Sequence, residues 1–488
     1  MSVMAARRSC AAHVFFRQTI ANESRRVFHN GGPSLVKRCN CHFLTAGCLI
    51  FLLIFSGCCG RQPFAAPTMI PGTDKDMMTA GYWITRHPSP DALVLSSEQI
   101  QALNWRIETD MKTVLDITRV TQPFANKEIA DAIRKDVAHL RSATRYLSSG
   151  GSVSSKFYDR MMRDMDLGGL ESEIYPAYGV ITCFTDQRVL PTMERLFARS
   201  SDVDIDMLQN NALDMGTPVL IVHRTLDGRW TYVRAPDSAG WVESDRIARC
   251  TRFKLESYVR PDAFVVTTSP KTDIYMNPEQ THAESSVQMG ARLPLIPTDD
   301  HLFHVQIPAR DANGYLVIRQ GYVSKSSANA GYLPYTARNI LQQAFKMLDT
   351  PYGWGGMYGE QDCSRFVQEV FATVGIMLPR NSADQAFVGD LVGEFTPATT
   401  PAVKNGGLLN KAVGGETLLY MKGHIMLYLG KVDDTPYVIH DIWGYHAHVS
   451  GGDRIYKIGR VAVTDLALGK GARGGSLLDR LLSVRVIR

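Results

Sequence analysis

One segment, Asp362–Val374, reads DCSRFVQEVFATV and decides how the C-terminal third of the chain is interpreted. Counted from Phe366, its apolar residues fall at i, i+1, i+4, i+5 and i+8, which predicts an α-helix buried on one face. Cys363 begins this helix, where the helix dipole and unpaired backbone N–H groups are expected to acidify a thiol. A lone cysteine is most often structural, but the polar neighbours Asp362 and Ser364 argue against a simple core position. Cys363 is therefore the candidate nucleophile.

Two histidines downstream lie in strand-like contexts. His424 begins the apolar run HIMLYLG, and His440 lies late in the run YVIHDIW over 437–443. An imidazole can accept a thiol proton and later protonate a leaving amine, because its pKa suits both tasks. Adjacent antiparallel strands would bring the two rings together, with His424 as the base and His440 orienting it. Each histidine alone is more often structural, whereas the combination with Cys363 favours catalysis.

Residues 81–205 are predicted to be mostly helical. Ser96 and Gln99 form a capping-box pattern ahead of apolar residues at helical spacing. Further helices are predicted over 127–147 and 155–165.

Two β-rich units follow, at residues 206–260 and 261–332. Short apolar runs divided by turns are typical of small barrels, and Asp227-Gly228 predicts a hairpin in the first unit. Each unit ends on a Gly-aromatic-Val sequence. Both units resemble bacterial SH3 (SH3b) domains.

The C-terminal segment, residues 333–488, resembles the NlpC/P60 family of cell-wall cysteine peptidases. The motifs that carry the resemblance occur in the family's order: PYGWGG at 351–356, DCS at 362–364, LPR at 378–380, GH at 423–424, and His440. The resemblance implies a papain-like α+β fold with Cys363 as nucleophile, His424 as base and His440 as orienting residue. Tyr352 is then expected to help the Cys363 backbone N–H stabilise the oxyanion. The whole chain is thus predicted to be a multidomain α+β protein.

The resemblance also implies a substrate, namely the bond between γ-D-glutamyl and a diamino acid in peptidoglycan stem peptides. Asp362 and Ser364 are expected to bind the free amine of an N-terminal L-Ala, and Trp354 to contact the substrate. Glu243 is the candidate acid from the first SH3b unit, with a solvated surface residue as the alternative. No metal or cofactor is expected. A non-catalytic wall-binding protein and an amidase or acyltransferase of the same fold remain alternatives.

One family feature is displaced in this chain. About 40 residues separate Arg380 from His424, where the family usually has an Asp before the strand. Asp390 and Glu416 are the candidates for that position. Elsewhere, Cys183 and Cys250 could pair in an oxidising compartment, but two isolated thiols are the favoured interpretation.

The N-terminus is interpreted as an export leader, residues 1–57. A basic pair, Lys37-Arg38, precedes an apolar run that is too short to span a membrane, because a span needs about 20 residues. Ser56-Gly57 before Cys58 resembles the lipobox of bacterial lipoproteins, which implies lipidation of Cys58 and a tether over 58–80. We expect a cell-envelope lipoprotein facing the periplasm. Cys59 in place of Asp favours the outer membrane, and free secretion is the alternative.

Charge gives no support for a nucleic-acid partner. The leader holds seven of the 53 Lys and Arg residues and one of the 48 Asp and Glu residues, which leaves 46 against 47. A nearly neutral mature chain has no basic surface to attract polyanions. The expected partners are stem peptides and, through the lipid, a membrane.

Overall fold

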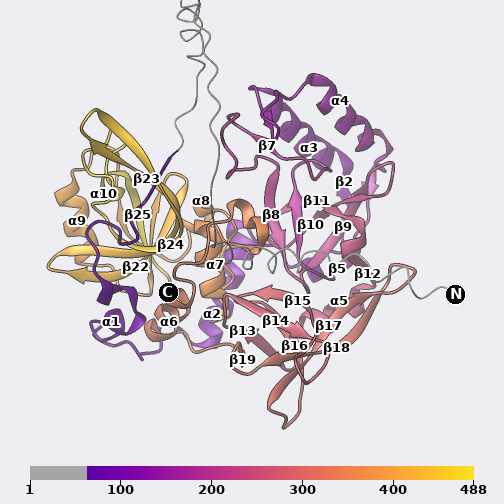
Figure 1. The fold of residues 1–488 in the computed structure, drawn as a ribbon. Coiled ribbons are helices and arrows are strands. Elements are labelled where there is room, and N and C mark those ends of the chain that lie inside the picture. Colours follow the sequence, from indigo (N-terminus) through magenta and orange to yellow (C-terminus); the bar gives the residue numbers. More distant parts are fainter. Residues whose placement is uncertain (1–62) are drawn as a thin grey trace, which may run out of the picture. The chain divides into compact units, whose positions relative to one another are not determined.

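The computed structural model describes residues 63–488, so the predicted leader and Cys58 lie outside the described part. Within these residues, three seven-stranded sheets and the helices packed on them form the fold (Figure 1). The multidomain α+β class predicted from the sequence is confirmed. Among the described residues, no helix is both long and apolar enough to cross a membrane.

The C-terminal sheet carries the predicted catalytic strands, in the order β1-β24-β23-β22-β21-β25-β20. Its strands are β1 (Phe64–Ala65), β20 (Asp390–Glu394), β21 (Thr417–Met421), β22 (His424–Val432), β23 (Thr435–Val449), β24 (Gly452–Asp465) and β25 (Leu481–Val486). The helices around it are α6 (Ala337–Lys346), α7 (Cys363–Ala372), α8 (Ser382–Gln385), α9 (Pro401–Leu409) and α10 (Leu477–Arg480).

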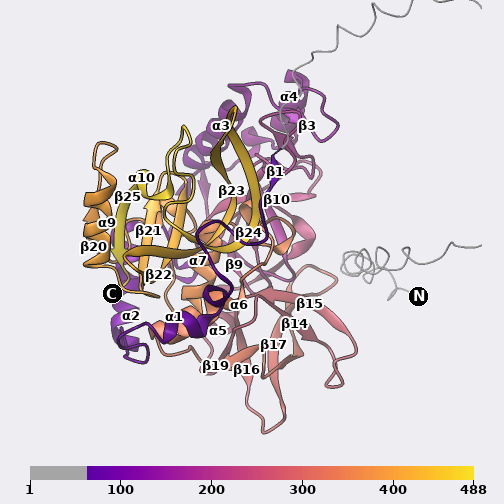
Figure 2. The ribbon, with the colours of Figure 1, turned by 60° about the vertical axis from the view of Figure 1, so that its left-hand side comes forward.

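Alternation along β22 explains how this sheet is covered on both faces. Ile425 and Leu427 join the core that contains α6 and α7, whereas Met426 and Tyr428 join a second core with α9 and α10. Side chains of successive strand residues point to opposite faces, so a continuous apolar run is expected for a strand buried on both. Figures 1 and 2 show α9 and α10 on the opposite side of the strands from α6 and α7.

The first β-rich unit forms an antiparallel sheet in the order β12-β5-β9-β10-β11-β6-β8. Its strands are β5 (Ala177–Ile181), β6 (Thr185–Arg188), β8 (Gln209–Leu213), β9 (Pro218–Arg224), β10 (Trp230–Arg234), β11 (Ala239–Glu243) and β12 (Ile247–Cys250). The predicted hairpin joins β9 to β10, and Gly228 takes a positive φ of 67° in its turn.

The predicted start of this unit at residue 206 is wrong, because β5 and β6 precede it. The strand β6 reads TDQR, and three of its four residues are buried although all are polar. Apolar alternation therefore could not reveal it. Helices α3 (Asn126–Arg141) and α4 (Ser155–Asp164) share a core with the same sheet through Trp230 and Trp241.

The second β-rich unit is also antiparallel, in the order β15-β14-β18-β17-β16-β13-β19. Its strands are β13 (Phe264–Thr267), β14 (Lys271–Tyr275), β15 (Ala283–Gln288), β16 (Arg292–Ile296), β17 (Leu302–Arg310), β18 (Leu316–Ser324) and β19 (Ala328–Ala330). Helix α5 (Arg252–Val259) connects the two units. Two short pairs complete the described strands: β2 (Phe124–Ala125) with β4 (Glu173–Ile174), and β3 (Tyr146–Leu147) with β7 (Leu196–Phe197).

The segment predicted as a tether is, from residue 63 on, part of the C-terminal domain. Strand β1 pairs in parallel with β24, and Tyr437 Oη donates to Gly72 O at 2.9 Å. Ile70 is buried in the core beneath α9 and α10. The tether prediction is therefore wrong over 63–80. The buried apolar residues of this segment are single and widely spaced, so the sequence shows no helical or strand periodicity there.

The first helices belong to the same body. The capping box at Ser96 and Gln99 is confirmed at the start of α2 (Ser97–Arg106). Trp83, on α1 (Ala80–Ile84), is fully buried, donates from Nε1 to Met77 O at 2.8 Å and packs against the Tyr437 ring. Helices α1 and α2 thus share the core of α6 and α7 and do not form a separate N-terminal domain with α3 and α4.

We expect Trp83→Ala to destabilise the protein by about 3–5 kcal/mol, because it leaves a cavity in the core that α1 shares with α7. Trp105→Ala is the matched control, since Trp105 on α2 is 54% exposed. The thermal unfolding midpoint of each variant checks this. Equal midpoints for the two variants would contradict a shared core.

Candidate active site

The start of helix α7 places Cys363. Asp362 is the N-cap residue, and its Oδ1 accepts from the backbone N–H of Arg365 at 2.9 Å. This satisfies one of the unpaired donors of the first helical turn, as an Asp at this position commonly does. Cys363 is the first residue of the helix and is 8% exposed. The predicted placement of Cys363 at a helix N-terminus is therefore observed.

The predicted acidification of Cys363 is not what the structure shows. Burial, followed by the negative charge of Asp362, raises the pKa of the thiol to about 12. A hydrogen bond from the backbone N–H of Ile425 acts in the opposite direction and brings the start of β22 against the sulfur. Desolvation thus raises the thiol pKa more than the helix N-terminus lowers it, and the thiol is neutral at neutral pH.

The two predicted histidines meet as expected. His424 Nε2 lies 2.6 Å from His440 Nδ1, and His440 Nε2 lies 3.0 Å from Thr464 Oγ1. Burial lowers the pKa of His424 to about 3, and burial followed by the charge of His424 holds that of His440 well below 6.5. Both rings are therefore neutral. If each ring donates from Nε2, every hydrogen bond of the chain is satisfied and His424 Nδ1 keeps a lone pair.

Thr464 was missed in the sequence. It lies on β24 opposite Val438, two residues before His440 on β23. Only the register between the two strands reveals this neighbour, because no local motif marks Thr464 as functional.

Tyr352 is half-buried beside these groups. Burial raises its pKa well above 10, and the charges of Asp362 and Cys363 act in the same direction. Its phenol therefore keeps its proton and can donate a hydrogen bond, as an oxyanion ligand must. The next residues, Trp354–Gly359, form a short turn that we call the glycine turn, and Trp354 is 37% exposed at its start.

Close packing explains the two glycines that follow Trp354. Gly355 and Gly356 have φ values of 61° and 84°, and a Cβ on them would lie 2.8 Å from Gln209 Cγ and 2.6 Å from Ala212 Cβ. Only glycine permits both the backbone conformation and this approach to β8. The PYGWGG motif thus fixes the glycine turn against the first β-rich unit.

Asp441, directly after His440, is a second residue that the sequence did not single out. Its side chain is fully buried, and neither carboxyl oxygen has a hydrogen-bond partner among the described residues. Burial raises its pKa well above the usual value, and the negative charge of Asp362 adds to this. Asp441 in turn raises the pKa of Cys363 and Tyr352, which places it near both.

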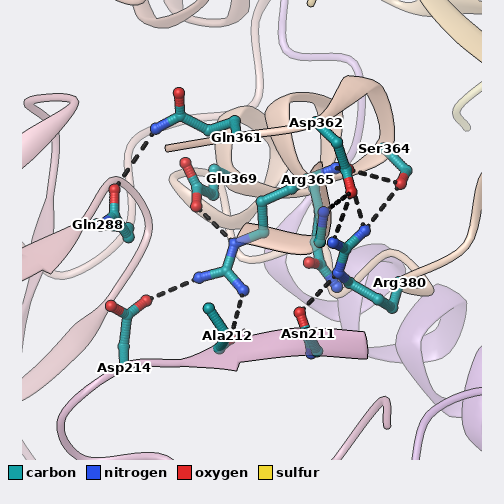
Figure 3. A network of polar contacts seen from close by, with 12 residues as sticks. Asn211, Ala212, Asp214, Gln288, Gln361, Asp362, Ser364, Arg365, Glu369 and Arg380 are labelled. Atoms are coloured by element: carbon teal, nitrogen blue, oxygen red, sulfur yellow. Dashed lines mark hydrogen bonds and ion pairs between the residues drawn. The ribbon is translucent and has the colours of Figure 1, made fainter. Parts of the chain in front are cut away.

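Asp362 and Ser364, the predicted amine ligands, are engaged in an internal network (Figure 3). Arg380 donates from Nη1 and Nη2 to the two carboxylate oxygens of Asp362, at 3.0 and 2.7 Å, and from Nη1 to Ser364 Oγ at 2.9 Å. Burial alone would raise the pKa of Asp362, but Arg380 holds it below its usual value. The charge of Asp362 is therefore already paired within the protein.

Arg365 extends this network to the first β-rich unit (Figure 3). It donates to Glu369 Oε1 at 2.6 Å, to Ala212 O at 2.9 Å and to Asp214 Oδ2 at 2.9 Å. Arg380 similarly donates from Nε to Asn211 Oδ1 at 2.7 Å. Both arginines are buried and connect the peptidase helix to β8 and the residues after it.

Among the described residues, no contact joins Glu243 to this network. Its carboxylate lies 3.5 Å from Arg246, beside the turn that follows β11. Asp186 is instead connected to the glycine turn, because Gln209 Nε2 donates to Asp186 Oδ1 at 2.9 Å and to Gly355 O at 3.2 Å. Asp186 lies on β6, the strand that the sequence did not predict.

The remaining sequence candidates lie elsewhere. Asp390 is on the edge strand β20, paired with Arg488, and Glu416 immediately precedes β21. Cys183 and Cys250 are half-buried and are not joined by a disulfide.

Because its pKa is about 12, we expect Cys363 to be alkylated slowly by iodoacetamide at pH 7. The rate should rise about tenfold per pH unit well beyond pH 8, since the thiolate fraction grows in that proportion below the pKa. Peptide mapping separates Cys363 from the other thiols, and Cys363→Ala gives the background. A rate plateau between pH 6 and 8 would instead show an acidified thiol paired with an imidazolium.

Comparison with known proteins finds similarity to two families. The NlpC/P60 family model matches residues 349–445, and that of the SH3 domain (SH3b1 type) matches residues 195–243. A gamma-D-glutamyl-L-lysine dipeptidyl-peptidase of Bacillus cereus is 32% identical over 149 residues, which cover 30% of this chain and 43% of that protein. One of Bacillus subtilis with the same name is 31% identical over 198 residues, which cover 38% and 59%.

A solved structure supports the same fold. It is described as an NlpC/P60 endopeptidase from Photobacterium damselae subsp. piscicida, with a TM-score of 0.71 at 20% identity over 87% of this chain and 99% of that one. The SH3b assignment of the second β-rich unit stays a prediction, because the family match covers the first unit only. The C-terminal part of this chain is therefore a domain of the NlpC/P60 family, preceded by an SH3b domain.

Proposed function

We propose that this protein is a cysteine endopeptidase that hydrolyses the γ-D-glutamyl–diamino acid bond of peptidoglycan stem peptides. The observation that carries the proposal is the buried Cys363 at the start of α7, combined with the hydrogen-bonded chain from His424 through His440 to Thr464. The names of the two Bacillus relatives support the choice of bond.

In this mechanism the thiol proton moves as the sulfur attacks. Cys363 and His424 are both neutral at rest, since the pKa of the thiol is about 12 and that of the imidazole about 3. The sulfur attacks the γ-carbonyl carbon while His424 Nδ1 takes the proton, and His440 accepts from His424 Nε2–H and orients the ring. The Cys363 backbone N–H and the Tyr352 phenol stabilise the oxyanion.

Collapse of the tetrahedral intermediate completes the first half of the reaction. The imidazolium of His424 gives its proton to the leaving amine of the diamino acid, and a thioester to Cys363 remains. Water then attacks the thioester with His424 as base, which releases the γ-D-glutamyl acid and restores the thiol.

We expect Cys363→Ala to reduce cleavage of L-Ala-γ-D-Glu-meso-diaminopimelate to background, because no other group forms the thioester. Cys250→Ala is the matched control and should leave turnover near wild type, since Cys250 lies on β12. Mass spectrometry of the products identifies the bond. Cleavage by Cys363→Ala, or cleavage at another bond, would contradict the proposal.

We further propose Asp186, in place of Glu243, as the acid that binds the free amine of the N-terminal L-Ala. Its carboxylate is connected through Gln209 to the backbone of the glycine turn, next to Trp354. Burial raises the pKa of Asp186, although the charges of Arg188 and Arg195 and the hydrogen bond from Gln209 act in the opposite direction. An ammonium group on the substrate would therefore be a favourable partner for the ionised carboxylate.

We expect Asp186→Asn to lower kcat/KM for the free-amine tripeptide by about 10- to 100-fold, the effect of losing one charged hydrogen bond. The same peptide with an N-acetylated alanine should be cleaved equally by the variant and the wild type. Glu243→Gln serves as control and should change neither rate. Loss of discrimination in Glu243→Gln alone would restore the original assignment.

The leader sequence supports a location. We propose that Cys58 carries a lipid and holds the protein at a membrane, facing the periplasm. The proposal rests on the basic pair, the short apolar run and the small residues before Cys58.

A further inference from the structure

A cavity of about 500 Å³ opens beside Tyr352 and lies outside the catalytic chain described above. Tyr352 contributes to its wall, so the cavity adjoins the expected oxyanion site. The glycine turn, β23 and β24 form part of its boundary, and residues near β7 form another part. A group bound here would be within reach of a peptide at Cys363.

The charged residues of this wall give it a net positive charge. Its ionisable groups, apart from two tyrosines, are Arg195, Lys457 and Asp204. Lys457 Nζ donates to Asp204 Oδ2 at 2.6 Å, and Trp443 Nε1 donates to the same oxygen at 2.9 Å. Asp204 is therefore already paired, and the positive charge that remains in the wall belongs to Arg195.

Arg195 is held by a neutral group at the cavity. It donates from Nη1 to Tyr358 Oη, and its guanidinium lies over the Tyr358 ring, 4.8 Å from the centroid. Stacking on an aromatic ring orients a guanidinium without neutralising it. The planar fork of Arg195 thus keeps donors for a bidentate carboxylate.

Tyr358 adopts a backbone conformation that is unusual for its residue type. Its φ is 63°, in the left-handed region, and its side chain is 62% exposed. Such a conformation is strained in a non-glycine residue and is enriched at functional sites. Here it brings the phenol over Arg195 at the rim of the cavity.

We propose that Arg195 is a specificity-determining residue that binds a carboxylate of the stem peptide in this cavity. The inference rests on the proposed function, since it names a further contact of the same substrate. The apolar residues Phe197, Met357 and Trp443 in the wall suit the aliphatic part that would carry the carboxylate. Two carboxylates that are present whatever the length of the stem fit this chemistry: the α-carboxylate of D-Glu and the distal carboxylate of diaminopimelate.

Three tripeptides distinguish the two carboxylates. The first is L-Ala-γ-D-Glu-meso-diaminopimelate, the second replaces diaminopimelate with L-Lys, and the third carries an amide in place of the D-Glu α-carboxylate. We expect Arg195→Gln to lower kcat/KM by about 10- to 100-fold, mainly through KM, for the peptides that carry the recognised carboxylate. The peptide that lacks it should be cleaved equally by both proteins.

Controls separate recognition from structure. Arg199→Gln, an exposed arginine four residues away, should change none of the three rates. Arg195→Lys should recover part of the loss, because it keeps the charge but not the fork. An equal fall for all three peptides, or no fall for any, would overturn the proposal.

Binding gives a readout that does not depend on turnover. In a Cys363→Ala background, calorimetry should show tighter binding of the peptide with the recognised carboxylate than of its neutral counterpart, and Arg195→Gln should remove the difference. If all three peptides bound equally to the protein with Arg195 intact, the result would contradict a carboxylate-binding site. Failure of the wild type to cleave any of them would instead count against the proposed function.

Discussion

The fold around the active site depends on two buried arginines. Arg365 and Arg380 pair with Asp362 and Glu369 within the peptidase domain, and each also binds the segment from β8 to Asp214. Removing one partner of a buried ion pair costs about 3–5 kcal/mol, because the other charge stays desolvated. The peptidase helix and the first SH3b sheet are therefore held in one arrangement. The glycine turn packs on β8, so its position also depends on the contact that the two arginines make with β8.

The same burial sets the chemistry at rest. A neutral thiol and two neutral imidazoles need no compensating charge, whereas a buried ion pair would have to be solvated by the protein. Asp441, whose carboxylate has no hydrogen-bond partner among the described residues, makes a thiolate still less favourable. In the proposed mechanism the charged state forms only as the substrate is attacked, when the oxyanion ligands have a charge to stabilise. In that mechanism, desolvation of the buried thiol and imidazoles favours the neutral resting state.

Local patterns predicted the helix at Cys363, the capping box at Ser96 and the hairpin at Gly228, because each depends on residues within one turn of chain. The meeting of His424 and His440 also followed from adjacent strands. Thr464, Asp441 and Asp186 could not be found in this way, since their roles depend on strand register and on contacts between distant segments. The sequence predicts amine binding by Asp362 because it does not show that the Arg380 side chain, from the next motif, pairs with the Asp362 carboxylate.

The pairing of β1 with β24 bears on where such an enzyme can work. If Cys58 carries the proposed lipid, only four residues lie between it and Pro63, where the described fold begins. The five Cα-to-Cα steps from Cys58 to Pro63 reach at most about 18 Å when extended. The edge of the peptidase sheet would then be confined to a thin layer next to the bilayer. Stem peptides would have to reach the membrane surface to be cleaved. The peptidase domain could not extend far from the membrane to bind more distant parts of the wall.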